Sequence, residues 1–146
     1  MVVSLDHLGA WLLKANGDRS DIAERAARRD GITHWCVYRS YRTALMDSRQ
    51  PFVLWVSGTR HVTPGIWAVG TLAGEAVADS GATARRQRVP VMLRWLDERI
   101  RLSRAAVLAD PRLRDLEVLR QPQAANPSFL TPGHVRALRD HLAPAW

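Results

Sequence analysis

The 146-residue sequence predicts one α+β domain, in which short strands and short helices are mixed without a repeating β-α-β pattern. Two kinds of segment support this class. Compact apolar runs bounded by Gly, Pro, Asn or Asp are typical of buried strands. Segments that begin with Ser or Thr and space their apolar residues helically are typical of short helices. No internal repeat or low-complexity stretch interrupts the pattern, so we expect a single domain over residues 1–146.

The N-terminal part predicts a strand followed by two short helices. Residues 10–14 form an apolar run, and the Asn-Gly-Asp sequence at residues 16–18 is a turn signal after it. Residues 20–24 resemble a capped helix start, and Gly31 can adopt the left-handed conformation that ends a helix. Ser40 can cap a second helix that extends to about residue 46.

The middle of the chain predicts a β-hairpin with a long tip. Pro51 precedes a buried strand at residues 52–56, and a loop returns the chain into a second strand at residues 66–73. The tip carries Arg60 and His61.

The next segments are an exposed loop and a stretch that periodicity alone does not assign. Residues 79–88 are polar and rich in Gly and Arg, which predicts the loop. In residues 89–102, apolar residues alternate with period two, as in a strand, at Val89, Val91, Leu93 and Trp95. A helical spacing fits Met92, Leu93, Leu96 and Ile100 equally well.

The C-terminal part predicts two helices. Ser103 can cap a short helix to residue 109, which Asp110 and Pro111 would end. Thr131 followed by Pro132 is a typical start of a helix. The buried stripe of that last helix is expected at Val135, Leu138 and Leu142.

The charge predicts a polyanionic partner. The formal net charge is +7, the sequence pI is about 11.1, and 20 of the 21 basic residues are Arg, Lys14 being the exception. The planar guanidinium pairs with phosphate and stacks on bases, and a pI above about 9 is typical of nucleic-acid-binding proteins. The alternative is that abundant Arg and Ala reflect a GC-rich genome. The candidate phosphate contacts are Arg60, Arg85, Arg86 and Arg88.

Several classes of site are not predicted. The lone cysteine, Cys36, allows neither an internal disulfide nor a cysteine-based zinc site, and its apolar surroundings favour an inert buried thiol. The five histidines show no metal-binding spacing, and no Ser/His/Asp group or carboxylate pair is readable. We expect no metal and no cofactor. The sequence shows neither a signal peptide nor an apolar run of about 20 residues, which predicts a soluble cytoplasmic protein without a membrane partner.

Tryptophan lies in two stretches, residues 35–42 and residues 53–58, the second followed by residues 65–70 across the hairpin tip. Aromatic faces beside arginine and a small hydroxyl suit a flat ligand with polar edges, such as a nucleobase. The alternative, that these aromatics fill the core, is the more common role of tryptophan.

An ordered series of motifs resembles the EVE-domain family. Residues 11–15 (WLLKA) resemble its opening Trp-Leu-x-Lys-Ser, and residues 35–41 resemble its Trp-x-Gly-Val-Arg-Asn-Tyr segment. Residues 53–57 and 65–70 are similar to its paired hydrophobic strands. Residues 110–113, 119–121 and 126–131 are similar to its Asp-Pro-Arg-Leu, Arg-Gln and Pro/Thr segments. The resemblance covers about residues 10–142.

The resemblance implies a PUA-like curved mixed sheet, or open barrel, flanked by helices, with residues 89–95 as a strand. EVE domains are relatives of YTH and ASCH domains and are thought to bind modified bases in DNA or RNA. By this analogy Trp35 is a wall of an aromatic cage, Trp55 and Ser57 line the hairpin side, and residues 14–16 approach the base edge. The implied ligand-binding set is Lys14, Ala15, Asn16, Trp35, Tyr38, Arg39, Ser40, Tyr41, Trp55, Ser57 and Gly58.

Three departures leave the ligand's identity open. Val37 replaces a Gly, Ser40 replaces an Asn, and residues 16–17 (Asn-Gly) replace a Glu-Pro pair of the family. A hydroxyl cannot span a base edge as a planar amide does.

We therefore predict a nucleic-acid- or nucleotide-binding module that cages a modified base carried by DNA or RNA, in an unspecified oligomeric state. An alternative is an ASCH-like hydrolase of modified nucleosides or RNA, with His34 or Lys14 as a base. A third hypothesis is a protein-interaction adaptor with a relict pocket. The sequence favours a binding protein over an enzyme.

Overall fold

The computed structural model describes residues 2–79 and 85–146. The strands are β1 (Ala10–Asn16), β2 (His34–Tyr38), β3 (Pro51–Ser57), β4 (Gly65–Leu72), β5 (Val77–Ala78), β6 (Arg86–Trp95), β7 (Leu102–Ser103) and β8 (Ser128–Leu130). The α-helices are α1 (Ile22–Ala27), α2 (Arg104–Ala109), α3 (Glu117–Arg120) and α4 (Pro132–Leu142). Short 3₁₀ turns are η1 (Leu5–His7), η2 (Thr43–Leu45), η3 (Glu98–Ile100) and η4 (Pro111–Leu113).

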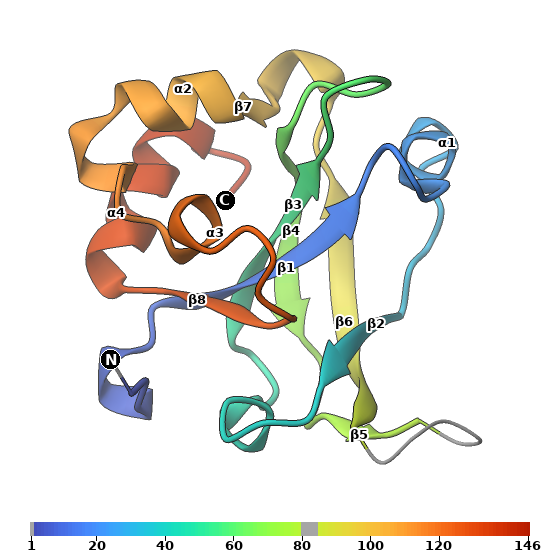
Figure 1. The fold of residues 1–146 in the computed structure, drawn as a ribbon, viewed down its shortest axis with the longest axis vertical. Helices are drawn as coiled ribbons and strands as arrows, with labels where there is room; N and C mark the ends of the chain where they lie inside the picture. Colours follow the sequence, from blue (N-terminus) through green and yellow to red (C-terminus); the bar gives the residue numbers. More distant parts are fainter. Residues whose placement is uncertain (1, 80–84) are drawn as a thin grey trace.

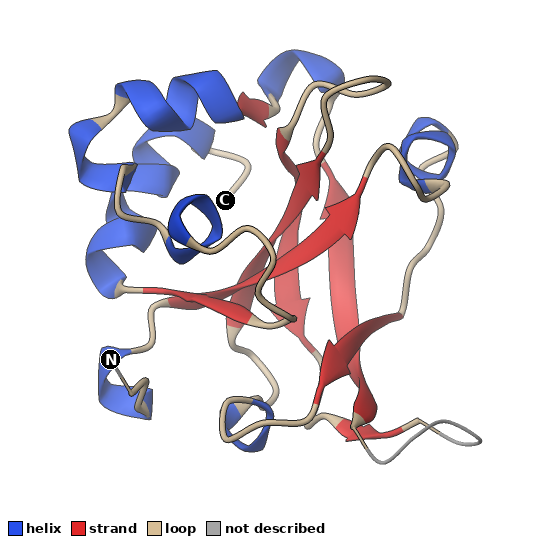
Figure 2. Ribbon diagram, viewed as in Figure 1, coloured by secondary structure: helices blue, strands red, loops and turns tan. Residues whose placement is uncertain are grey.

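The strands form one strongly curled mixed sheet in the order β2-β6-β4-β3-β1-β8, with β5 on β6 and β7 on β4. β1 and β3 are parallel, and the other pairs are antiparallel. Helices α2, α3 and α4 gather on one side of the sheet and α1 lies on the other (Figures 1 and 2). The predicted α+β class, with a curved, barrel-like sheet flanked by helices, is confirmed.

Alternating side chains of the central strands enter two separate cores. In β3, Phe52, Leu54 and Val56 join a cluster with Trp11 and Leu13, whereas Val53 and Trp55 join a second cluster. The second cluster also contains the buried stripe of α4. Because successive side chains of a strand point to opposite faces, an apolar strand covered on both faces divides its residues in this way.

Residues 89–95 are a strand, as the resemblance implies. β6 pairs with β2 on one side and with β4 on the other. Val89, Val91 and Trp95 are buried in the first cluster and Leu93 packs against it, so the four share a face. Ladder pairing on two sides excludes the helical alternative for this segment.

Most predicted elements are confirmed. The first strand, the β3–β4 hairpin and the two C-terminal helices lie where expected. The Ser103 side chain accepts the Ala106 N–H at 3.1 Å, and the Thr131 side chain accepts the His134 N–H at 3.1 Å, so each caps its helix as its residue type predicts.

Three expectations need correction. The Ser40 segment forms only the turn η2, because Leu45 donates to the carbonyl of Arg42, three residues back, at 2.9 Å. The left-handed residue after α1 is Arg29 (φ 53°) rather than Gly31, since the chain turns two residues earlier. Of the predicted loop at residues 79–88, Arg86 onward belongs to β6, and residues 80–84 lie outside the described residues.

In residues 2–79 and 85–146, no helix has the length and apolar character needed to cross a membrane. Nor do the His, Cys, Asp and Glu residues of these segments form a group of three that could hold a metal ion.

Candidate functional site

A pocket of about 280 Å³ lies where β1 ends, between this strand, the start of α1 and β2. We call it the β1–β2 pocket. It brings together five of the predicted ligand-binding residues: Lys14, Ala15, Asn16, Trp35 and Tyr38. Cys36, Ile22, Arg25 and Asn126 complete much of the wall. β1 and β2 are not neighbours in the sheet, so the curl of the sheet brings them together.

Asn126 fastens the two strands to each other. Its side-chain oxygen accepts the Lys14 N–H at 2.8 Å, and its side-chain nitrogen donates to the carbonyls of Lys14 (3.1 Å) and Cys36 (3.4 Å). Its own carbonyl accepts the Tyr38 N–H at 3.0 Å. One amide side chain therefore replaces the hydrogen bonds that a neighbouring strand would make. The sequence identifies Asn126 only as part of a Pro-containing segment.

Trp35 is the aromatic wall of the pocket. It is half-buried and packs against the core cluster that contains Trp11 and Leu13. Four other tryptophans are buried in the core, and three of them donate the indole N–H within the protein: Trp11 to Gln50, Trp67 to the Thr63 carbonyl and Trp95 to the Asp30 carbonyl. Cys36 is half-buried and lines the pocket, which corrects the expectation of a buried thiol.

Trp55 is not in the pocket, contrary to the resemblance. Its side chain is 3% exposed and lies in the second core cluster, on the face of the sheet away from Trp35. It alternates with Leu54 and Val56, which face the first cluster. The expected cage therefore does not form: among the described residues that line the pocket, Trp35 and Tyr38 are the aromatic ones.

The Lys14 ammonium stabilises a neighbouring loop. It donates to the carbonyls of Pro122, at 3.4 Å, and of Ala124. Burial lowers its pKa, an effect that the nearby Glu117 carboxylate opposes and Arg42 reinforces. Both contacts hold residues 122–124 against β1, which positions Asn126.

Asn16 has a structural role as well. Its side-chain oxygen accepts the N–H groups of Asp18 (3.0 Å) and Arg19 (3.1 Å), which fixes the turn after β1. Its amide nitrogen is the part of the side chain that could donate to a ligand.

A wider groove of about 530 Å³ adjoins the β1–β2 pocket and shares Tyr38 and Asn126 with it. We call it the 38–42 groove. Predicted residues Arg39, Ser40 and Tyr41 line it, together with Arg42, Arg85, Glu117 and Gln121. The Arg39 N–H donates to the Arg85 carbonyl at 2.6 Å, which places two exposed arginines at one edge.

The floor of the groove is a buried ion pair that the sequence does not reveal. The Arg42 guanidinium contacts both carboxylate oxygens of Glu117, at 2.5 and 2.7 Å, and donates to the Pro127 carbonyl at 3.1 Å. The two side chains are 18% and 10% exposed. Burial alone would raise the pKa of Glu117, but the hydrogen bonds and charge of Arg42 outweigh it and lower that pKa. These bonds also raise the pKa of Arg42.

The four predicted phosphate contacts do not form one surface. Arg85 lines the 38–42 groove, Arg86 pairs with Tyr38 in the β2–β6 ladder, and Arg88 forms an ion pair with Asp79 at 3.3 Å. Arg60 belongs to the β3–β4 loop, at the opposite end of the sheet from β5 and the start of β6 (Figure 1).

Ser57 ends β3 and Gly58 begins this loop, and both are outside the lining of the β1–β2 pocket. The Ser57 hydroxyl donates to the Ala15 carbonyl at 3.2 Å. Gly58 has φ 148°, and a side chain there would meet the Asp18 carboxylate at 2.8 Å.

The Asp18 carboxylate organises the loop that carries Arg60. It accepts the N–H groups of Thr59 (2.9 Å), Arg60 (3.2 Å) and His61 (3.1 Å). These bonds, led by that from Thr59, hold the pKa of Asp18 below its ordinary value. A depressed folded-state pKa means that the stabilisation is present above the ordinary pKa and is lost as the pH falls through the folded-state value.

We expect the amides of residues 59–61 to lose protection from hydrogen exchange in Asp18→Asn, and in the parent protein as the pH falls through the lowered folded-state pKa of Asp18. Removing the negative charge removes the charge-assisted acceptor. The exposed Asp6→Asn substitution is the matched control and should leave these amides unchanged. Equal protection in the two variants would contradict this role of Asp18.

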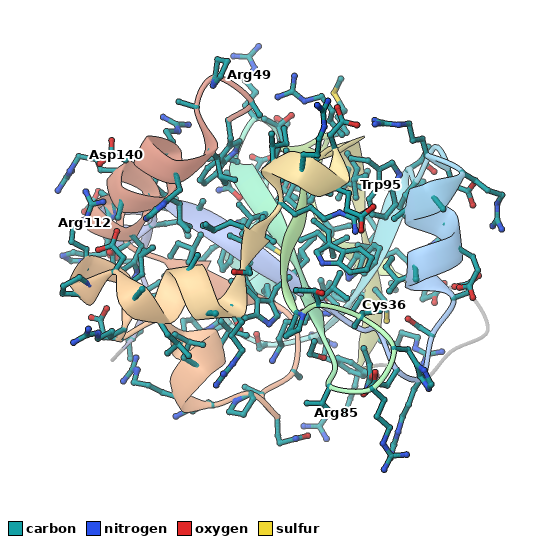
Figure 3. All side chains as sticks on the ribbon, turned by 90° about the horizontal axis from the view of Figure 1, so that it is seen from above. Cys36, Arg49, Arg85, Trp95, Arg112 and Asp140 are labelled. Atoms are coloured by element: carbon teal, nitrogen blue, oxygen red, sulfur yellow. The ribbon has the colours of Figure 1, made fainter. Side chains whose placement is uncertain are left out.

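The Asp-Pro-Arg-Leu motif at residues 110–113 has a structural role. Asp110 caps η4 by accepting the Arg112 N–H at 2.9 Å, and its carboxylate also bonds His141 at 2.9 Å. The Arg112 side chain pairs with Asp110 at 2.8 Å and with Asp140 at 2.6 Å, joining η4 to α4 (Figure 3). The motif thus links two helical segments, η4 and α4, on the side of the sheet away from α1.

Comparisons with known proteins support the fold. No family model matches the chain, and no curated protein matches it. An NMR structure of a Rhodopseudomonas palustris protein is similar over 92% of this chain and 93% of its own, with TM-score 0.69 and 17% identity. A Pseudomonas putida crystal structure has TM-score 0.65 and 19% identity, covering 90% and 98% of the two chains. A hypothetical protein from Leishmania major has TM-score 0.63 and 16% identity, covering 94% and 97%. At these identities the similarity establishes the fold alone.

Proposed function

We propose that this protein binds nucleic acid or nucleotides and holds one modified base in the β1–β2 pocket, against the indole of Trp35. The observation that carries the proposal is a half-buried tryptophan in a pocket of about 280 Å³ that adjoins an arginine-bordered groove. Proteins that bind unpaired bases stack them on aromatic faces and follow the backbone with positive charge. The proposed partner is DNA or RNA that carries such a base. We also propose that the protein is located in the cytoplasm.

The pocket lining supports a modified base in particular. Ala15, Ile22 and Cys36 bring apolar atoms to a wall that also holds polar groups. An added methyl group buried there gains about 0.8 kcal/mol, which corresponds to roughly a fourfold gain in affinity. Since a base inside a duplex has both faces covered by its neighbours, a base that stacks on Trp35 enters unpaired, from a single strand or flipped from a duplex.

We place the sugar-phosphate backbone of the nucleic acid along the 38–42 groove. Arg39 and Arg85 are exposed at one edge, and no ion pair to either is formed within the described residues. Arg42, by contrast, is neutralised by Glu117. The free guanidinium groups are therefore the ones that we assign to phosphate.

The hydrolase alternative finds less support. Its strongest candidate base, Lys14, directs its ammonium to two backbone carbonyls. His34 is exposed and contacts Thr33 at 3.0 Å.

The test is a panel of short DNA and RNA oligonucleotides that differ in one base, unmodified or methylated at different ring positions, measured by fluorescence anisotropy. We expect at least one modified base to bind roughly fourfold or more tightly than its parent base. Equal affinity across the panel would contradict selection for a modification. Mass spectrometry of the same samples separates binding from hydrolysis, because a new product would favour the enzyme.

We expect binding to weaken steeply with ionic strength, and Arg85→Gln to reduce the slope of log affinity against log salt by about 1, because one phosphate contact is lost. The control is Arg136→Gln, an exposed arginine of α4 that does not line the 38–42 groove. If the two variants change the slope equally, the nucleic-acid backbone does not follow the 38–42 groove, and the positive charge of the protein attracts it without a defined contact.

A further inference from the structure

A second cavity, of about 570 Å³, lies between α1, the β3–β4 loop and the segment from η3 to β7. We call it the α1–β4 pocket. Ala23, Val62 and Pro64 give it apolar walls, and Glu98, Arg101 and Ser103 bring polar groups to it. It lies on the other flank of α1 from the β1–β2 pocket, because Ile22 and Arg25 line that pocket whereas Ala23 and Ala27 line this one.

Arg101 is the distinctive group of this pocket. Its guanidinium carbon lies 3.9 Å from the centre of the Trp67 ring, so the cation is stacked on the indole. Trp67 is held rigidly, since it is 5% exposed and its indole N–H donates to the Thr63 carbonyl at 3.0 Å.

The stacked guanidinium lacks the partners that buried donors ordinarily have. Its Nε atom is buried and has no hydrogen-bond partner. Among residues 2–79 and 85–146, no carboxylate forms an ion pair with Arg101. Burial lowers its pKa, while the nearby Glu98 carboxylate acts in the opposite direction. Arg42 of the same protein shows the usual outcome for a buried arginine, a two-point contact with a carboxylate.

We propose that the α1–β4 pocket binds a small oxyanion, a carboxylate or phosphate group, through the guanidinium edge of Arg101. A guanidinium stacked on a ring keeps its N–H groups in the stacking plane, where they form a fork for two oxygens of an anion. Because the buried Nε atom is out of reach of a ligand, this fork is formed by the two terminal nitrogens, Nη1 and Nη2.

Ser103 and His61 fit the same ligand. The Ser103 oxygen accepts the Ala106 N–H at 3.1 Å as a helix cap, which leaves its hydroxyl hydrogen free to donate. His61 lines the pocket from the β3–β4 loop, which Asp18 holds in place. The Glu98 carboxylate repels an anion, so its charge lowers the affinity of the pocket for the oxyanion.

The test is isothermal titration calorimetry of the full chain in a low-salt, phosphate-free buffer, with inorganic phosphate and acetate titrated separately to distinguish the two oxyanions. We expect saturable binding of at least one, with a Kd of about 1 mM or tighter. Arg101→Met should weaken it by about tenfold or more, because two charge-assisted hydrogen bonds are lost. The control Arg99→Met removes the same charge from the exposed side of η3 and should change the Kd less than about twofold.

Three further variants sharpen the result. Arg101→Lys keeps the charge but not the planar fork and should bind weakly. Glu98→Gln should bind more tightly, since a repelling charge is removed. Trp35→Ala should bind the oxyanion like the parent, so that failure of the base-binding proposal is distinguishable from failure of this one.

Thermal unfolding completes the test. Without an anion, Arg101→Met should melt at or above the temperature of the parent, because a buried unpaired donor is removed. The anion that binds should raise the melting temperature of the parent, and at the same concentration it should raise that of Arg101→Met much less. The proposal is overturned by absence of saturable binding of either anion, by equal weakening in Arg99→Met, by Arg101→Lys binding like the parent, or by a marked loss of stability in anion-free Arg101→Met.

Discussion

Glu117→Ala should destabilise the protein by about 3–5 kcal/mol, because it leaves the Arg42 guanidinium buried without its counter-charge. For a chain of this size that corresponds to a fall in melting temperature of roughly 6–20 °C. Arg42 contacts both oxygens of Glu117 and the pair is largely buried, so solvent screening does little to reduce the loss. Thermal unfolding followed by circular dichroism measures the effect.

The matched control is Glu75→Ala, which removes a carboxylate from an exposed position and should change the free energy of unfolding by less than about 0.5 kcal/mol. The double variant Arg42→Met/Glu117→Leu should be more stable than Glu117→Ala, because no buried charge remains. If Glu117→Ala and Glu75→Ala unfold at the same temperature, the ion pair does not stabilise the fold.

The same pair gives a pH dependence. The pKa of Glu117 is lowered in the folded state, so its contribution to stability is present above the ordinary pKa of glutamate. It is lost as the pH falls through the folded-state value. The difference in stability between the parent and Glu117→Ala should therefore shrink on acidification, and a constant difference would show that the carboxylate charge is not the cause.

Trp35→Ala should weaken binding of the preferred oligonucleotide by roughly 5- to 150-fold, because base–aromatic stacking contributes about 1–3 kcal/mol. Trp35→Phe should lose less, since a smaller aromatic face remains. The free energy of unfolding should fall by less than the 3–5 kcal/mol typical of a fully buried aromatic, as Trp35 is only half-buried.

The control for this prediction is Trp146→Ala. Trp146 is also half-buried, but it lies beneath Arg139, whose guanidinium carbon is 5.1 Å from its ring, and lines neither the β1–β2 pocket nor the 38–42 groove. Its removal should leave affinity within about twofold. A folded Trp35→Phe that binds every oligonucleotide like the parent, together with a Trp35→Ala that unfolds, would place Trp35 in the core and contradict the base-binding proposal.

The sequence places about half of the candidate site. The segments at residues 14–16 and 35–41 do meet around two adjoining cavities, as the resemblance implies. Trp55 was indistinguishable from Trp35 by composition and neighbours. Alternation within a strand shows which residues share a face, but not which layer that face meets.

The residues that the sequence misses all act over long separations. Asn126 joins β1 to β2 across 112 and 90 residues, and Arg42 meets Glu117 across 75. Neither contact produces a short-range pattern in the sequence, because its two residues are far apart along the chain. A buried arginine or asparagine looks like any surface one until its partner is known.

What the sequence by itself determined is local: the strands of the β3–β4 hairpin, the capped starts of α2 and α4, and the Arg excess, because each depends on neighbouring residues and their backbone preferences. The tertiary structure decided the strand order, the opposite faces of Trp35 and Trp55, and the stacking of Arg101 on Trp67. It also decided that residues 89–95 are a strand, because the apolar pattern fitted a strand and a helix equally well. The physical reason is that these features depend on how the sheet curls, which brings together side chains whose separation along the chain carries no signal.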